Sequence, residues 1–246
     1  TRFKAEAKDF NGIKAIYANG HKRDRIDVNG DGKYTFKLVD RAGNESVFTV
    51  VVDKKAPKFV GLKNGKFYQD DIMVSVDDAN LDKITARIDA EGYKVVEIEN
   101  NTPLTKESIY LLTATDKAGN KESIYVAVDK TNPEFVGLKN GHQYNKDMTV
   151  DVKDLKVKTI ELYSYYENTT KTIKNGYILG EEGKYKLTAT DYSGRTTSIV
   201  VIIDKTAPSM VVGDKEYKAG YDEIIYSSTR FKAEAKDFNG IKAIYA

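Results

Sequence analysis

The sequence has no cysteine, no tryptophan and only two histidines among its 246 residues. Without cysteine there are no disulfide bonds, thiolate metal ligands or cysteine nucleophiles. The histidines, His21 and His142, stand at unrelated places. The sequence also has no nucleophile elbow, phosphate-binding glycine loop or paired-histidine metal motif. We therefore expect that this chain is not an enzyme.

Long apolar runs and an excess of one charge are also missing. No apolar run approaches the roughly 20 residues of a membrane-spanning helix. Lys+Arg total 39 and Asp+Glu total 37, with 40% hydrophobic residues. This balance is typical of globular domains rather than of disordered tails or nucleic-acid binders. We expect no nucleic-acid partner and no membrane span in this segment.

Internal repeats organise the chain at two scales. The stretch TRFKAEAKDFNGIKAIYA occupies 1–18 and again 229–246, a spacing of 228 residues. A shorter repeat ends in VVVDKKAP, VAVDKTNP and VIIDKTAP, at Pro57, Pro133 and Pro208, with spacings of 76 and 75 residues. Subtracting these from 228 leaves one more module of similar size. The sequence therefore predicts a super-repeat of three modules.

The repeat predicts the module boundaries. Residues 56–131 and 132–206 are complete modules, whereas 1–55 is the C-terminal part and 207–246 the N-terminal part of another module type. Neither end piece should bury a full core by itself. We expect the chain to be cut from a longer continuous repeat. The alternative is that two copies complete each other head to tail.

Period-two alternation of apolar residues dominates every module, which predicts β-strands with one buried face. We expect about seven short strands per module. The alternating sets include Tyr34, Phe36 and Leu38; Phe48, Val50 and Val52; Ile72, Val74 and Val76; and Phe231, Ala233 and Ala235.

Each module also carries a turn, written DRAGN, DKAGN or DYSGR. Its glycine stands where a hairpin with a type I turn and a bulge needs a positive φ. The first aspartate can accept hydrogen bonds from the turn amides, which gives it a structural role. The turn residues are Asp40 and Gly43, Asp116 and Gly119, and Asp191 and Gly194.

GDGKY, ending at Tyr34, and EEGKY, ending at Tyr185, resemble the tyrosine corner of immunoglobulin-like sandwiches, whose hydroxyl bonds upstream backbone. The middle module keeps Tyr110 but reads KESIY. The predicted fold class is all-β, with tandem immunoglobulin-like β-sandwich modules of about 76 residues. The DxxGN hairpin, hydrophobic strand and V-D-K-T-x-P run together resemble the tandem bacterial immunoglobulin-like repeats of Gram-positive surface proteins.

This resemblance covers the whole chain and implies an extracellular location, on a bacterial cell surface or secreted. Such repeats serve as stalks, adhesins, lattice components and spacers beside enzymes, so the resemblance specifies architecture better than function.

One loop resembles half of a calcium-binding motif. DVNGDG places Asp27, Asn29 and Asp31 at alternate positions before a glycine. The twelfth position, which needs an acidic ligand in an EF-hand, is Leu38. We therefore favour a plain acidic turn and expect no cofactor. A looser Ca²⁺ site in this loop is the alternative.

Other aspartates recur in every module, and interdomain calcium would require several of them at each junction. A lysine follows each aspartate at a module end, which favours turn capping and solvated strand ends instead. The recurring residues are Asp9, Asp78, Asp154 and Asp237 after the second strand, and Asp53, Asp129 and Asp204 at the module ends.

ELYSYYEN concentrates three tyrosines in the predicted third strand of one module. Alternation places Tyr163 and Tyr165 on one face and Tyr166 on the other, so some rings should be exposed. Exposed rings bind sugars, but they also serve in sheet surfaces and lateral contacts. These residues are the candidate ligand-binding site.

The linkers are short, with three residues between each module-end aspartate and its proline. Such linkers limit bending, so we expect an elongated, semi-rigid rod. The sequence thus predicts a stalk, fibre or surface-layer element that contacts its neighbouring modules and other copies of the protein. The alternatives are an adhesin that binds a glycan or host protein, and an accessory region of a surface enzyme.

Overall fold

The structure is a computed structural model that describes residues 3–10, 12–212, 214–218, 220, 232–237 and 240. The predicted strand position Phe231 lies outside this set, as does most of the repeated stretch 229–246. Among the described residues, no helix is long and apolar enough to cross a membrane. The chain divides into two units, 1–128 and 129–246, and each is described by itself.

Residues 58–128, all of them described, form eight strands rather than about seven. They are β7 (Lys58–Val60), β8 (Lys66–Tyr68), β9 (Ile72–Asp77), β10 (Leu81–Ile88), β11 (Lys94–Ile98), β12 (Thr102–Leu104), β13 (Ser108–Asp116) and β14 (Lys121–Val128), with a short 3-10 helix at Asp89–Glu91. One sheet has the order β12-β9-β7 and the other β11-β10-β13-β14-β8. The β8–β14 pair is parallel, and the other pairs are antiparallel.

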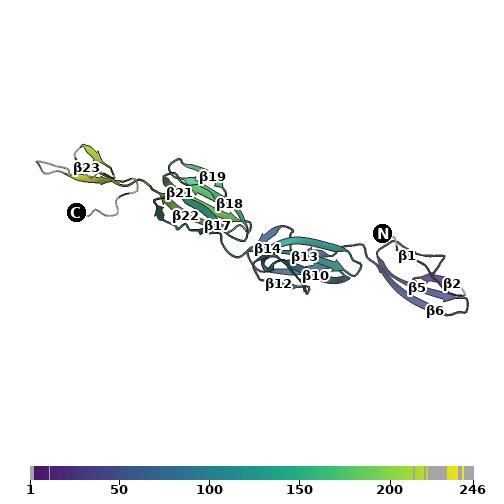
Figure 1. The fold of residues 1–246 in the computed structure, drawn as a ribbon. Helices are drawn as coiled ribbons and strands as arrows, with labels where there is room; N and C mark the ends of the chain where they lie inside the picture. The colour runs from purple at the N-terminus through teal and green to yellow at the C-terminus, as the bar shows by residue number, and fades with distance from the viewer. Residues whose placement is uncertain are drawn as a thin grey trace. The chain divides into compact units, whose positions relative to one another are not determined.

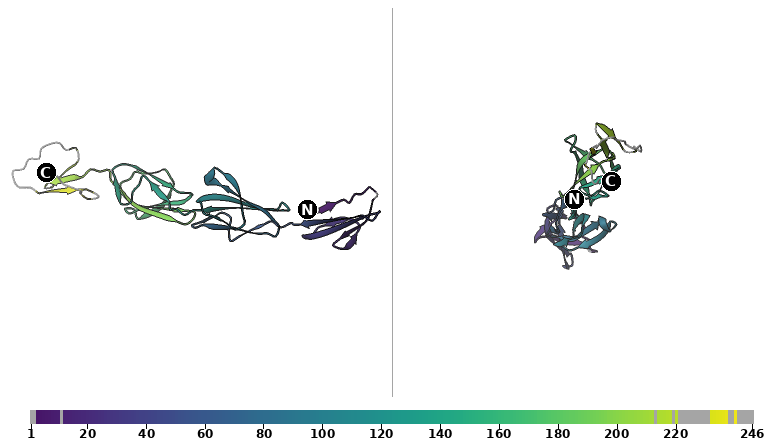
Figure 2. Two further views of the ribbon diagram at one scale, coloured as in Figure 1. Left: turned by 90° about the horizontal axis from the view of Figure 1, so that it is seen from below. Right: turned by 90° about the vertical axis from the view of Figure 1, so that its left-hand side faces the viewer.

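The two sheets pack face to face and share one core (Figures 1 and 2). Val74 of the smaller sheet and Leu112 of the larger sheet are both 0% exposed. Along β13 the residues alternate between buried and half-buried as far as Leu112, as a strand with one face on the core requires. The module is therefore an immunoglobulin-like β-sandwich.

Residues 134–203 repeat this architecture strand for strand. The strands are β15 (Glu134–Val136), β16 (His142–Tyr144), β17 (Met148–Lys153), β18 (Val157–Ser164), β19 (Thr169–Ile173), β20 (Tyr177–Leu179), β21 (Gly183–Asp191) and β22 (Thr196–Ile203). The sheet orders are β15-β17-β20 and β16-β22-β21-β18-β19, and β16 is parallel to β22. Its core is a separate cluster that includes Val150 and Leu187. The chain is thus built of tandem sandwich modules, while the residue boundaries proposed for them stay predictions.

The N-terminal segment forms a more open structure. Its strands are β1 (Phe3–Ala5), β2 (Ile13–Ala18), β3 (His21–Arg23), β4 (Ile26–Val28), β5 (Gly32–Asp40) and β6 (Glu45–Val52), in sheets β3-β2-β5-β6 and β1-β4. Alternation predicts a core position at Phe48, yet Phe48 is 53% exposed, whereas its counterpart Ile124 is 6% exposed. The reason is that this segment lacks counterparts of β7 and β8, so nothing covers that face.

The C-terminal segment supplies strands of the type that the N-terminal segment lacks. They are β23 (Ser209–Val212), β24 (Lys215–Tyr217) and β25 (Ala233–Lys236), in the order β24-β23-β25. Strands β1 and β25 come from the two copies of the repeated stretch. β1 pairs with β4 and β25 pairs with β23. In the complete module, β9 makes both kinds of pairing, with β12 and with β7.

Local geometry at the turns follows their chemistry. Gly43, Gly119 and Gly194 have φ values of 95°, 90° and 95°. The three corner tyrosines each donate a hydrogen bond to a carbonyl oxygen four residues upstream. These bonds are Tyr34 to Gly30 (3.0 Å), Tyr110 to Lys106 (2.6 Å) and Tyr185 to Glu181 (3.0 Å). The middle module makes this bond despite its different sequence, because a main-chain acceptor needs no particular side chain.

Candidate functional site

The half-motif of a calcium loop is partly occupied by a lysine. Lys54 Nζ donates hydrogen bonds to the main-chain oxygen of Asn29 and, at 3.1 Å, to Asn29 Oδ1. Asp27 lies in β4, and its side chain is outside the described set. Asp31 is exposed and belongs to neither of the carboxylate clusters that the described residues form.

The three tyrosines of ELYSYYEN do not share one strand. Tyr163 lies in β18, but Tyr165 and Tyr166 lie in the turn between β18 and β19, which corrects the predicted strand. The rings of Tyr163 and Tyr165 meet edge to face at 5.0 Å, and Lys184 Nζ lies 5.0 Å from the centre of the Tyr165 ring. Tyr166 is 85% exposed. These rings form a small exposed patch, in which Tyr165 has a cation on its face.

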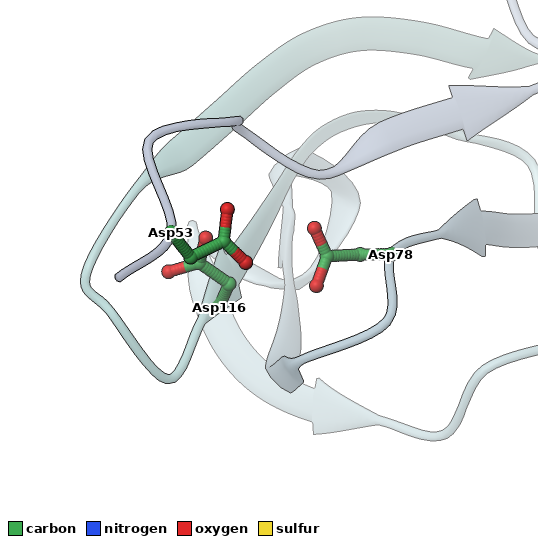
Figure 3. Close-up of side chains that lie close together, drawn as sticks. All are labelled: Asp53, Asp78 and Asp116. Carbon is green, nitrogen blue, oxygen red and sulfur yellow. The ribbon is translucent and has the colours of Figure 1, made fainter. Parts of the chain in front are cut away.

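Aspartates from three separate strand ends meet in the first unit. Asp53 follows β6, Asp78 follows β9 and Asp116 ends β13. One oxygen of each lies within 4.8 Å of the others. In Figure 3, Asp53 and Asp116 lie next to each other and Asp78 points toward them from the opposite side. We call these residues the first carboxylate cluster.

Asparagine amides satisfy most of the first carboxylate cluster. Asn80 Nδ2 donates to Asp53 Oδ2 at 2.7 Å, and Asn120 Nδ2 donates to Asp116 Oδ2 at 2.7 Å. The bond from Asn80, followed by that from the Lys55 amide, lowers the pKa of the Asp53 carboxyl from its ordinary value. Asn120 also donates to the carbonyl oxygens of Asp53 (3.1 Å) and Lys55 (3.2 Å). Asn120 therefore ties the linker to the module that follows it.

The second unit holds an equivalent group, the second carboxylate cluster, formed by Asp129, Asp154 and Asp191. Asp129 and Asp191 are both 0% exposed. The Oδ1 atom of Asp191 accepts hydrogen bonds from Ser193 Oγ (2.8 Å), Gly194 N (2.7 Å) and Arg195 N (2.9 Å). Its Oδ2 atom is buried and accepts none.

The two clusters differ in the residues around them. Lys156 stands two residues after Asp154, where the first cluster has Asn80. Arg195 stands four residues after Asp191, where the first cluster has Asn120. Lys156 Nζ lies 4.8 Å from the centre of the Tyr192 ring. Two neutral amides are thus replaced by two cations around the same three carboxylates.

The sequence favours solvated strand ends at these positions, and for Asp129 this prediction is wrong. Asp129 is fully buried while the adjacent Lys130 is exposed. Neighbouring residues in extended chain point to opposite sides, so the lysine beside each aspartate does not reveal where the carboxylate points. A better signal is the constant spacing of 25 residues from Asp53 to Asp78 and from Asp129 to Asp154.

A hollow of about 980 Å³ in the N-terminal segment is lined by residues that include Ala18, Tyr34 and Phe36. Tyr110 and Leu112, the counterparts of Tyr34 and Phe36 in the complete module, are buried core residues. The hollow therefore corresponds to the uncovered core of this segment.

No family model and no curated protein match this sequence. Solved structures similar to it include DIP-gamma Ig1+Ig2, at 14% identity over 61% of this chain and 97% of that chain, with a TM-score of 0.29. The N-terminal eight Ig domains of Down Syndrome Cell Adhesion Molecule match at 13% identity over 82% and 34%, with a TM-score of 0.27. A Ca²⁺-stabilized adhesin of an Antarctic bacterium matches at 16% identity over 86% and 71%, with a TM-score of 0.19. These similarities concern the fold alone.

Proposed function

We propose that this chain is a structural segment of a long bacterial repeat protein, secreted or displayed on the cell surface, where it acts as a stalk, fibre or surface-layer element. The observation that carries this proposal is the fastened linker. Asn120 holds the carbonyl oxygens of Asp53 and Lys55, and only Lys54 to Ala56 separate Asp53 from Pro57. A tethered, proline-containing linker restricts bending between modules, as a spacer requires.

A non-catalytic role agrees with the chemistry of the described residues. His21 is exposed in β3, and His142 contacts the Tyr144 ring edge-on at 4.8 Å. Neither histidine belongs to a carboxylate cluster. The clusters themselves lie at strand ends beside linkers, where they can stabilise a connection between elements.

X-ray scattering on proteins with one, two and three copies of the 228-residue repeat tests the spacer role. We expect the maximum dimension to grow in proportion to the number of copies. A flexible Gly-Ser segment inserted after Lys55 is the matched control, because it should abolish this proportionality while leaving each module folded. A native protein whose dimension grows no faster than that of the control would contradict the proposal.

The surface location requires its own test. Protease added to intact cells should remove the repeat region if it is displayed outside, whereas it should survive if it is inside. Cross-linking on the same cells would show whether copies of the protein contact each other.

Glycan binding at the tyrosine patch is the second candidate function. The exposed rings of Tyr165 and Tyr166 favour it, because sugars stack on such faces. On a glycan array, Tyr166→Ala should lose any signal given by the native chain. Tyr125→Ala, in another module and at a ring that is 47% exposed, is the control. An array without signal for the native chain would contradict this function.

A further inference from the structure

We propose that the second carboxylate cluster, Asp129, Asp154 and Asp191, binds one divalent, oxygen-preferring cation such as Ca²⁺. Ca²⁺ takes six to eight oxygen ligands, with carboxylates prominent among them. This inference goes beyond the spacer role, because a spacer needs no ion.

The buried Oδ2 atom of Asp191 is the first reason. The residue is 0% exposed, and three donors from its own turn occupy Oδ1 only. Oδ2 accepts no hydrogen bond. A carboxylate oxygen removed from water loses its hydration, and this loss is normally offset by a donor or a cation. A coordinated cation supplies the interaction that Oδ2 lacks.

The spacing of the oxygens is the second reason. One oxygen from each aspartate lies within 4.8 Å of the others. Ca²⁺–oxygen distances of 2.3–2.6 Å place oxygens on opposite sides of the ion about 4.6–5.2 Å apart. The three carboxylates are therefore already close enough to share one ion.

Charge around the cluster leaves room for a cation. Lys156 and Arg195 are the nearby positive residues, and the Lys156 ammonium lies over the Tyr192 ring. Three ionised carboxylates carry one more unit of charge than these two side chains neutralise. At the first cluster, by contrast, the amides of Asn80 and Asn120 already bind the oxygens of Asp53 and Asp116.

The ion would have a structural consequence within the second unit. Asp129 is the residue directly after β14, while Asp154 and Asp191 belong to the following module. A shared ion would join the start of this linker to that module. It would thus replace the tether that Asn120 provides at the first cluster, where the second cluster has Arg195 instead.

Terbium luminescence on the full chain tests the site. Tb³⁺ is a luminescent substitute for Ca²⁺, and this tryptophan-free protein has 17 tyrosines to sensitise it, Tyr192 being next to Asp191. We expect one strongly bound Tb³⁺ per chain, displaced by Ca²⁺. Asp191→Asn should abolish it, and the matched Asp116→Asn variant in the first cluster should retain it. No bound ion, or an ion lost in Asp116→Asn but kept in Asp191→Asn, would overturn the proposal.

Two further variants separate binding from folding and from internal neutralisation. Asp154→Asn preserves an acceptor for the Lys156 amide, which lies 2.9 Å from Asp154 Oδ1. It should stay folded by circular dichroism and still bind Tb³⁺ much more weakly. Arg195→Asn removes a positive charge and should tighten binding about fivefold or more. Binding that occurs only in Arg195→Asn would show that Arg195 already serves as the counter-ion and would refute the site in the native chain.

Discussion

Replacing Asn120 with alanine should loosen the linker between Asp53 and Pro57 more than any comparable change in a turn. The amide of Asn120 reaches three acceptors: Asp116 Oδ2 at 2.7 Å, the Asp53 carbonyl at 3.1 Å and the Lys55 carbonyl at 3.2 Å. Asn44, its counterpart in the preceding hairpin, reaches Asp40 Oδ2 at 2.7 Å. Comparing the two alanine variants therefore isolates the two bonds to the linker.

Each neutral hydrogen bond contributes about 0.5–1.5 kcal/mol to stability. Because three acceptors share the two amide hydrogens of Asn120, we expect the two linker bonds to contribute about 1–2 kcal/mol together. Asn120→Ala should destabilise its module by that much more than Asn44→Ala destabilises the N-terminal segment. Native-state hydrogen exchange is suited to the measurement, because it reports separate modules in one chain.

The Lys55 amide, which donates to Asp53 Oδ1 at 3.1 Å, provides a local readout. Its protection from exchange should fall in Asn120→Ala and stay unchanged in Asn44→Ala. Equal losses in the two variants, with the Lys55 amide unaffected, would refute the view that Asn120 holds the linker.

Three other predictions follow from single residues. The pKa of Asp53 is lowered by the hydrogen bond from Asn80, so its stabilising contribution is present above the ordinary carboxyl pKa near 4 and is lost as the pH falls through the lowered value; acid titration followed by thermal unfolding should show this loss, and Asp53→Asn should reduce it. Leu187→Ala removes a side chain that is 0% exposed and should cost about 2–5 kcal/mol in denaturant unfolding of its module. Gly119→Ala should cost about 1 kcal/mol in thermal unfolding, because φ is 90° and an added Cβ would meet no atom within 4 Å, so backbone strain is its main effect.

Much of the fold could be predicted from the sequence because its determinants are local. Alternation along Tyr110, Leu112 and Ala114 identifies a strand with one buried face, and all three side chains are buried. The failure at Phe48 has a different origin. Alternation reveals which side of a strand is apolar, but another segment must be present to cover it.

The carboxylate clusters were harder to predict because they depend on three-dimensional proximity. Asp129 and Asp191 are 62 positions apart in the sequence, and only the sandwich topology brings them together. Each aspartate alone is typical of a turn or strand end. The replacement of Asn120 by Arg195 carries no meaning in the sequence until the position of the Asn120 amide is known.

The parallel pairing in each complete module determines how it would respond to a mechanical load. β8 pairs with β14 through Lys66–Val126, Phe67–Ala127 and Tyr68–Val128, and β16 pairs with β22 in the same way. Tension along the chain would act at the start of the first strand and at the end of the last, in opposite directions along parallel neighbours. The hydrogen bonds between them would be sheared together instead of opening one after another. Tension would therefore have to break several bonds at once before either sandwich could extend.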